Sequence, residues 1–571
     1  MKTKVNFLNS EAIIRLTPIK ENTILIADNI LNGKWKIFPT LPDLDIENID
    51  NIWEMKYPST ESTYSLYTYA LYPVSYLLNA YELSGEETYL DKASLISQSF
   101  ISWINSSDIK LSAKRKKILF GDHAVSNRTQ SLCYLLLSLD SSGKEIPNSL
   151  VNQLILQGEY LSNIENYSNY NHGLMMDLAL LGLVNVLIGK KYDFPEFFQD
   201  NLLERLSSSL LRDVTEDGVH VENSAGYHFW IMNFYKKINK PLLELDKTLA
   251  DKCEKVLNKS LEYAKYITRS DGSVPAIGDT HASLKSTPSH ALGSKFFSDS
   301  NIVIFRDLDD KVWASFNSGY KTHVHKHSDD GAFNLFYKGK DVFFDPGFLS
   351  YENDKDSLLI KSSRFHNTVQ PVDEEINIIK QDLNGGIKNK QYKDNLSKSK
   401  ILGFYCNTKY EASVAMISGY DCGVIRRLVV YDHNGYFLIH DYVSEKNKSN
   451  QVFEQRFNIG HELSLMIKDD LIVLTDKHGD ELCEIKQLLR KDKKNTELIP
   501  YIEQSFYAKG FNTKGKCERL VFSFENYESL ILIKLKHYDS RTSNPDIPKN
   551  QFYNIREEVF SFIDNVINKF N

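Results

Sequence analysis

The stretch GLMMDLALLGLVNVLIG (residues 173–189) decides the fold of the first half of the chain, because its apolar residues recur at helical spacing. Gly85, Gly143 and Gly189 stand where helices should stop. Successive amphipathic helices must bury one face against their neighbours, so we expect helical hairpins arranged as an incomplete (α/α) toroid, with a plain α-solenoid as the alternative. Three further segments share the helical spacing: SLYTYALYPVSYLLNAYELSG (65–85), TQSLCYLLLSLD (129–140) and SLVNQLILQGEYLSNI (149–164).

After about residue 301 the pattern changes to short β-rich runs, such as AFNLFYKG (332–339), RRLVVYD (426–432) and YFLIHDYVS (436–444). Asn434-Gly435, between the last two runs, is typical of a two-residue hairpin turn. Many such strands predict a large antiparallel β-sandwich domain. The closing segment 556–570 has helical spacing, and the polar segment 384–400 is expected to be an exposed loop.

We therefore predict an α+β multidomain chain. An N-terminal extension (1–60) packs on the toroid, the toroid spans residues 61–295, and the sandwich spans residues 296–571. The chain is long enough for at least two such cores.

The composition is that of a soluble globular protein, with 42% hydrophobic and 25% charged residues and a net charge of -7. This balance gives no reason to expect nucleic acid or a membrane as a partner. No stretch approaches the ~18 uninterrupted apolar residues of a membrane span. Residues 1–20 carry no visible signal peptide, so the default expectation is a cytoplasmic protein, with a periplasmic or secreted one left open. We expect a monomer or homodimer, and free thiols at the six scattered cysteines.

The densest polar cluster lies where the two halves join. In an extended chain His325, His327 and Asp329 would point to one side, because side chains two apart share a face. Imidazole and carboxylate together suit Zn²⁺, and His327, Asp345 and His366 could come from neighbouring strands. The alternative is a solvated, histidine-rich surface turn.

Three stretches of the helical half differ from an ordinary helix surface. Asn171 and His172 begin an apolar helix, where free backbone donors and the positive end of the dipole favour an anion. Asn171 could equally be only a helix cap, Tyr227 a core residue, and Arg128 a partner for a surface carboxylate. The stretches are Asp122-His123 with Asn127-Arg128, Asn171-His172-Gly173, and the run 222–228.

In combination these motifs resemble the heparinase II/III family of polysaccharide lyases, whose helical domain is similar to that of alginate lyases. The run HVHKHSDDGAFNLFYKGKDVFFDPGFLSY (323–351) is similar to the signature of the family's C-terminal domain, and RFHNTVQPVDE (364–374) to a later segment. NHG (171–173) and GYH (226–228) resemble the two active-site stretches of the helical domain. DGSVPAIGD (271–279) resembles the segment that closes that domain.

The resemblance implies roles for single residues. His172 and Tyr227 match the catalytic His and Tyr, Asn171 the residue that helps neutralise the substrate carboxylate, and His325 the second catalytic His. The implied metal ligands are His327, Asp345 and His366, which match residues that hold a structural zinc ion in some members. The implied substrate-binding residues are Arg128, His123, Glu222 and His228.

The implied activity is β-elimination on an acidic polysaccharide or oligosaccharide. The C5 proton of a uronic acid is removed, the C4 oxygen leaves, and an unsaturated sugar remains. This hypothesis requires His172, Tyr227 and His325 to act at one groove. Met175 and Ala332 depart from the family pattern, which leaves the particular sugar open.

Two other functions stay open. One is a glycoside hydrolase on an α/α toroid, with Asp217, Glu222 and Asp279 as candidates for its two carboxylates. The other is a non-catalytic glycan-binding protein.

Overall fold

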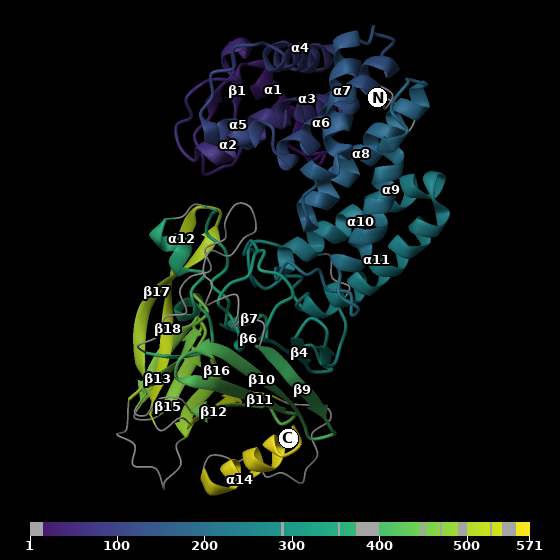
Figure 1. The fold of residues 1–571 in the computed structure, drawn as a ribbon. Coiled ribbons are helices and arrows are strands. Elements are labelled where there is room, and N and C mark those ends of the chain that lie inside the picture. The colour runs from purple at the N-terminus through teal and green to yellow at the C-terminus, as the bar shows by residue number, and fades with distance from the viewer. Residues whose placement is uncertain are drawn as a thin grey trace. The chain divides into compact units, whose positions relative to one another are not determined.

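The computed structural model describes most of the chain, and Figure 1 shows its course. By packing, the chain divides into two compact units, Met1–Asp213 with Ile231–Leu257, and Val214–Trp230 with Asn258–Asn571. The sequence predicted a boundary at residue 295, whereas residues 214–230 and 258–295 pack with the second unit. The described residues are 15–286, 290–351, 354–372, 399–446, 451–468, 471–488, 499–525, 528–538 and 556–570.

The first unit consists of packed helices. Contacts join α3 to α4, α6 to α8, and α8 to α9, and α1 packs on α3. A short two-stranded sheet, β1 (Lys34–Trp35) with β2 (Leu44–Asp45), follows the first helix. The helices are α1 (Thr23–Leu31), α2 (Glu61–Tyr69), α3 (Tyr72–Ser84), α4 (Glu87–Ile104), α5 (Ala113–Leu119), α6 (Asp122–Ser141), α7 (Asn148–Ser162), α8 (Tyr170–Lys190) and α9 (Phe197–Arg212). Two more, α10 (Ala225–Leu245) and α11 (Lys247–Ile267), contribute to both units.

The helical segments and helix ends that the sequence predicted are found in the structure, with two exceptions. The segment 65–85 forms two helices, because Leu71 is left-handed (φ 58°) and Pro73 lies in the first turn of α3. Gly85 ends α3 with φ 68°, as predicted. Helix α8 continues past Gly189 and ends at Lys190, and Lys191, the C-cap residue, takes the left-handed conformation instead (φ 56°).

Helix α8 is apolar on nearly all sides because it lies within the helical unit. It is the one helix among the described residues that is long and apolar enough to cross a membrane, although the sequence predicted no such candidate. Of its most apolar window, 78% is buried, as in the core helix of a soluble protein. Length and composition are therefore weak evidence for a membrane span here.

The second unit contains three antiparallel sheets. Their strand orders are β3-β4-β5-β6-β7, β14-β15-β16-β19-β12-β11-β10-β9 and β17-β18-β13-β8. The first sheet has β3 (Lys295–Phe297), β4 (Ile302–Arg306), β5 (Val312–Asn317), β6 (Ala332–Tyr337) and β7 (Lys340–Phe343). The second has β9 (Lys400–Cys406), β10 (Tyr410–Tyr420), β11 (Gly423–Asp432), β12 (Tyr436–Lys446), β14 (Ser464–Lys468), β15 (Leu471–Thr475), β16 (Glu481–Leu488) and β19 (Glu528–Leu535). The third has β8 (Val369–Pro371), β13 (Phe453–Asn458), β17 (Tyr501–Gly510) and β18 (Thr513–Phe524).

One hydrophobic core joins the three sheets of this unit. Phe333 of the first sheet, Val429 and Ile439 of the second, and Phe457 and Phe522 of the third all belong to it. These sheets form the large antiparallel sheet domain that the sequence predicted, with β5, β6 and β13 buried along their whole length. A hairpin joins β11 to β12 at this place, but its loop has three residues, His433, Asn434 and Gly435, and not the two that the sequence predicted, because Asp432 still pairs with Tyr436. Of these three, only Gly435 takes a positive φ (87°).

The closing helix α14 (Arg556–Ile567) forms as predicted. Its Ile563 and Val566 pack against Leu428, Leu438 and Leu532 of the eight-stranded sheet. A short helix, α12 (Lys355–Leu359), lies between β7 and β8 in the chain. The predicted loop 384–400 lies outside the described residues except for Ser399 and Lys400.

Candidate functional site

In the second unit, the candidate site is built around residues 322–328, which we call the histidine loop. It is irregular, with His325 in the left-handed conformation (φ 55°), so the predicted extended segment is wrong. The Asn223 side-chain amide donates hydrogen bonds to the backbone oxygens of Thr322 (2.7 Å) and Val324 (2.9 Å). These bonds satisfy two backbone carbonyl groups of the loop, which in a β-strand would accept hydrogen bonds from a neighbouring strand. Asp329 does not join the two histidines and instead pairs with Lys326.

Asp279 connects two of the three histidines of this loop, His325 and His327. Its Oδ2 lies 2.6 Å from His325 Nδ1, and its Oδ1 lies 2.9 Å from His327 Nε2. Lys361 Nζ lies 3.1 Å from the same carboxylate. Burial alone would raise the pKa of Asp279, but the charge of Lys361 and the histidine hydrogen bonds hold this pKa well below its usual range. The carboxylate is therefore a buried anion.

Tyr227, in the first turn of α10, stacks on His325. The two ring centroids are 3.7 Å apart and the rings are inclined by 14°. The Tyr227 hydroxyl lies 2.5 Å from that of Tyr351. On its other edge, His325 Nε2 lies 3.6 Å from a Glu222 oxygen. A hydroxyl and an imidazole are thus held together on rigid neighbours, an arrangement suited to moving protons.

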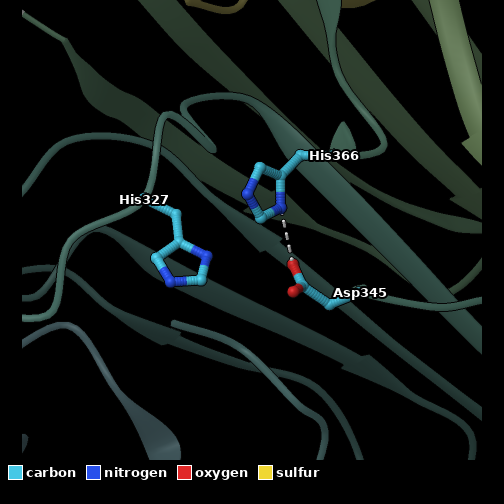
Figure 2. A group of neighbouring side chains, drawn as sticks. All are labelled: His327, Asp345 and His366. Carbon is cyan, nitrogen blue, oxygen red and sulfur yellow. Dashed lines mark hydrogen bonds and ion pairs between the residues drawn. The ribbon is translucent and has the colours of Figure 1, made fainter. Parts of the chain in front are cut away.

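The predicted ligands His327, Asp345 and His366 gather at one place, and Figure 2 shows their side chains pointing toward one another. One potential ligand atom from each residue lies within 4.8 Å of the others, and all three residues are buried. His366 Nδ1 lies 3.1 Å from Asp345 Oδ2. Among the described residues, His327 Nδ1 and His366 Nε2 have no hydrogen-bond partner. Buried nitrogens without partners are costly unless something binds them, so the donors fit a metal ion.

In the first unit, His172 lies beside Asp122. His172 Nδ1 is 3.1 Å from Asp122 Oδ2, and Ser168 Oγ donates to the same oxygen. Burial would raise the pKa of Asp122, but His172 and Ser168 outweigh it and lower this pKa. The His172 side chain is 42% exposed, so it is oriented by a carboxylate and still open to solvent.

Asn171, His123 and Gly173 surround this pair. Asn171 is 5% exposed and lies in the first turn of α8. The His123 ring contacts that of His172, and burial together with this neighbour lowers the pKa of His123 to about 3. A Cβ at Gly173 would lie 2.2 Å from the Ser168 backbone oxygen, which explains why glycine follows His172. His123 is therefore an uncharged neighbour of His172.

Three predicted substrate-binding residues are buried instead. Arg128 is 2% exposed, donates to the backbone oxygens of Tyr69 and Leu119, and packs over the Phe100 ring. It therefore braces the helical core. Arg128 was expected to contact the substrate. The sequence alone does not show whether an arginine side chain is exposed or buried.

Glu222 and His228 need the same correction. Glu222 is fully buried, and its carboxylate lies 3.3 Å from His220 Nε2 as well as near His325. His228 is 2% exposed, its Nε2 lies 3.0 Å from the Ser260 backbone oxygen, and burial lowers its pKa to about 3. Glu222 therefore lies against His325, whereas His228 is held by the Ser260 backbone.

Sequence reasoning missed three residues of the site. Asp279 was considered only as the end of a motif and as a hydrolase candidate, and Lys361 and Tyr351 were not considered. The signal for Asp279 was present in DGSVPAIGD. Gly278 has φ 61°, and a Cβ there would lie 2.3 Å from the Asn223 backbone oxygen, so the Gly-Asp pair marks a close approach.

Two family models match the chain. The one described as heparinase II/III N-terminus matches residues 2–303, and the one described as heparinase II/III-like, C-terminal matches residues 290–546. No curated protein sequence matches.

Solved structures match over nearly the whole length. A crystal structure of heparinase III is 16% identical with a TM-score of 0.74, and the alignment covers 94% of this chain and 87% of that one. Heparan sulfate lyase HepC from Pedobacter heparinus is 16% identical with a TM-score of 0.63, covering 93% and 86%. These similarities confirm the predicted fold, a helical N-terminal region followed by a large antiparallel sheet domain.

Proposed function

Because the chain belongs to the heparinase II/III family, we propose that it is a polysaccharide lyase that cleaves a uronic-acid-containing glycan by β-elimination. The observation that carries this proposal is the stacking of Tyr227 on His325, with His325 fixed by Asp279. A glycosaminoglycan or a similar acidic glycan is the proposed substrate. The similarity in fold to heparinase III and to heparan sulfate lyase HepC supports this substrate class.

The first requirement of the reaction is to acidify the C5 proton. Neutralising the neighbouring carboxylate lets negative charge gather there as the proton leaves, and one fixed donor is commonly worth ~3 kcal/mol. We assign this role to Asn171 with the help of the α8 N-terminus, whose backbone N–H groups favour an anion.

The second requirement is a base at C5 and an acid at O4. The base takes the C5 proton, its electron pair forms the C4–C5 double bond, the C4–O4 bond breaks, and the acid protonates O4. We assign the acid to the Tyr227 hydroxyl. The base is His172 if the C5 proton lies anti to O4. If the proton lies syn, Tyr227 has to start as the phenolate, which takes the C5 proton and then passes that same proton to O4, so that one group on a single face serves both atoms.

His172 can accept a proton only if its ring is held in the correct tautomer, and we assign this task to Asp122. Asp122→Asn should lower kcat by roughly 10²-fold on an anti substrate, with KM changed little, because Nδ1 loses its carboxylate partner. Steady-state kinetics on the purified variant measures this. Ser168→Ala is the matched control, since it removes another partner of the same carboxylate and should cost much less. Equal losses in the two variants would contradict the assignment.

His327, Asp345 and His366 would hold a structural zinc ion. Such an ion would supply a rigid link between the histidine loop and the segments that follow β7 and precede β8. We assign it no contact with the substrate. One ring nitrogen each of His327 and His366 has no hydrogen-bond partner within the described ranges of the chain, which supports this proposal.

The hydrolase alternative is less well supported. Two carboxylates would have to reach the sugar, but the Glu222 and Asp279 side chains are both 0% exposed. Asp217 accepts hydrogen bonds from Thr215 of its own loop and from Ser300 and the Asp299 backbone of another segment, so it is engaged in linking these two segments. A silent binding protein would not need a histidine fixed between two carboxylates beside a tyrosine.

A substrate panel tests the proposed function. Incubation with heparosan, heparan sulfate, hyaluronan, chondroitin and alginate should produce new ultraviolet absorbance from at least one, because the new double bond is conjugated with the carboxylate. Mass spectrometry of the products identifies the sugar. Amylose, which has no uronate, is the control and should give no signal.

The other two functions give different results in this assay. New reducing ends without the chromophore would favour the hydrolase. Binding without any product from the whole panel would favour the glycan-binding protein, and either result would contradict the lyase proposal.

A further inference from the structure

We infer that Asp279 is a positioning residue that holds His325 and the metal-ligand candidate His327 on the two oxygens of one carboxylate, so that metal binding and the position of His325 depend on each other. For the role of His325, the inference rests on the proposed function and deepens it. Asp279 itself touches neither the substrate nor the metal ion in this scheme.

The geometry divides the carboxylate between the two histidines. Oδ2 accepts from His325 Nδ1 at 2.6 Å, and Oδ1 accepts from His327 Nε2 at 2.9 Å. All three side chains are buried, with His325 the most exposed at 9% and the other two at 0%. Two hydrogen bonds to a buried anion are stronger than neutral ones, so each ring is fixed in orientation and tautomer.

The hydrogen bond to Asp279 determines which ring nitrogen of His327 is left to face the metal-ligand cluster, and which one of His325 is left on the side away from Asp279. His327 donates through Nε2, which leaves the Nδ1 lone pair for the cluster with Asp345 and His366. Nδ1 is buried and has no hydrogen-bond partner in the part of the chain that the structure describes. A carboxylate behind a metal-ligating histidine is the usual way in which proteins orient such a ring.

His325 is oriented by the same rule. It donates through Nδ1, so its Nε2 lies on the opposite edge of the ring, 3.6 Å from Glu222, while the ring face stacks on Tyr227. A rotation of the carboxylate that improves the bond to one histidine would weaken the bond to the other. The two rings are therefore coupled through one rigid group.

The surroundings keep Asp279 charged and in place. Lys361 Nζ lies 3.1 Å from Oδ1 and 3.4 Å from Oδ2, so one cation contacts both oxygens of the buried anion. The positive φ of Gly278 and its close approach to the Asn223 backbone fix the main chain just before Asp279. An asparagine at position 279 has one acceptor oxygen, so it can accept from only one of the two histidines.

Asp279→Asn tests the inference through two separate sites. Because outer-shell partners commonly contribute 10–100-fold, we expect zinc affinity to fall by about 10- to 100-fold and kcat by a similar factor, with KM within about threefold of wild type. Zinc affinity is measured by competition with a chromophoric chelator. The absorption spectrum of the cobalt-substituted protein should also shift, although Asp279 is not a ligand, because His327 is reoriented.

Removing the metal ion from both proteins tests the coupling itself. Chelation should lower the kcat of the wild type but change that of Asp279→Asn much less, because the link to His325 is already broken. If chelation lowers kcat by the same factor in the wild type and in Asp279→Asn, the two effects are independent and the inference is overturned. A loss at only one of the two sites, with the other unchanged, would overturn it as well.

Asp217→Asn is the matched control. It changes a half-buried carboxylate of the same unit that accepts from Thr215 and Ser300, and it should leave zinc affinity and kcat unchanged. If Asp279→Asn does not fold, Lys361→Gln replaces it, because loss of the cation should weaken both histidine bonds and lower both quantities together.

Failure of the inference and failure of the proposed function give different results. A wild-type protein that makes no unsaturated product from any glycan of the panel would contradict the proposed function. Unchanged zinc affinity and an unchanged cobalt spectrum in Asp279→Asn would overturn the inference alone. A wild-type protein that binds no zinc would overturn it too.

Discussion

Tyr227→Phe should lower kcat by about 10²–10⁴-fold while KM stays within about threefold of wild type. The phenyl ring keeps the stacking on His325, so substrate binding and the fold remain, but the group that protonates O4 is lost. Initial rates from the ultraviolet signal of the unsaturated product measure this, and a thermal melt verifies that the variant is folded.

Tyr351→Phe is the matched control for this variant. It removes the other hydroxyl of the same 2.5 Å pair and leaves Tyr227 intact. If Tyr227 transfers the proton, Tyr351→Phe should cost less than tenfold, since it alters only a neighbour. An unimpaired rate in Tyr227→Phe would remove Tyr227 from the mechanism.

Removal of the metal ion should lower the melting temperature by roughly 5 °C or more. A ligand present at 100 times its Kd stabilises the folded state by about 2.7 kcal/mol, and 1 kcal/mol is worth about 2–4 °C in a domain of 150–250 residues. The buried nitrogens of His327 and His366 would lose their only proposed partner. Elemental analysis of the unchelated protein identifies the ion, and a melt with and without chelator measures the loss.

His327→Ala tests whether this stability comes from the proposed site. The variant should bind no zinc, and chelator should no longer change its melting temperature, because the site is already lost. His478→Ala is the control, since His478 lies exposed in the turn after β15, and its melt should respond to chelator as the wild type does. Zinc retained at full occupancy in His327→Ala would place the ion elsewhere.

Local patterns predicted most of the elements. The spacing of apolar residues reports which face of a helix or strand is buried, and Asn434-Gly435 indicated the place of a hairpin although not the length of its loop. The prediction failed at Leu71 and Pro73, where one apolar segment covers two helices, because its pattern of apolar residues continues across the break.

Part of the candidate site was also predictable. His327, Asp345 and His366 were named as one set and lie together in the structure. The expectation that they come from neighbouring strands was wrong, because His327 lies in the irregular histidine loop, Asp345 follows β7 and His366 precedes β8. Arg128, Glu222 and His228 were expected to bind substrate from the resemblance to the family, but each is buried and engaged within the protein.

By itself the sequence determined the order of a helical and a sheet-rich half, the family, and the residue types available for chemistry. These features are encoded in neighbouring residues, where spacing and motif can be observed directly. Only the tertiary structure decided that Asp279 joins His325, His327 and Lys361, which are 46, 48 and 82 positions away. Contacts across such separations depend on how distant segments pack, and the sequence of either segment alone contains no record of its partner.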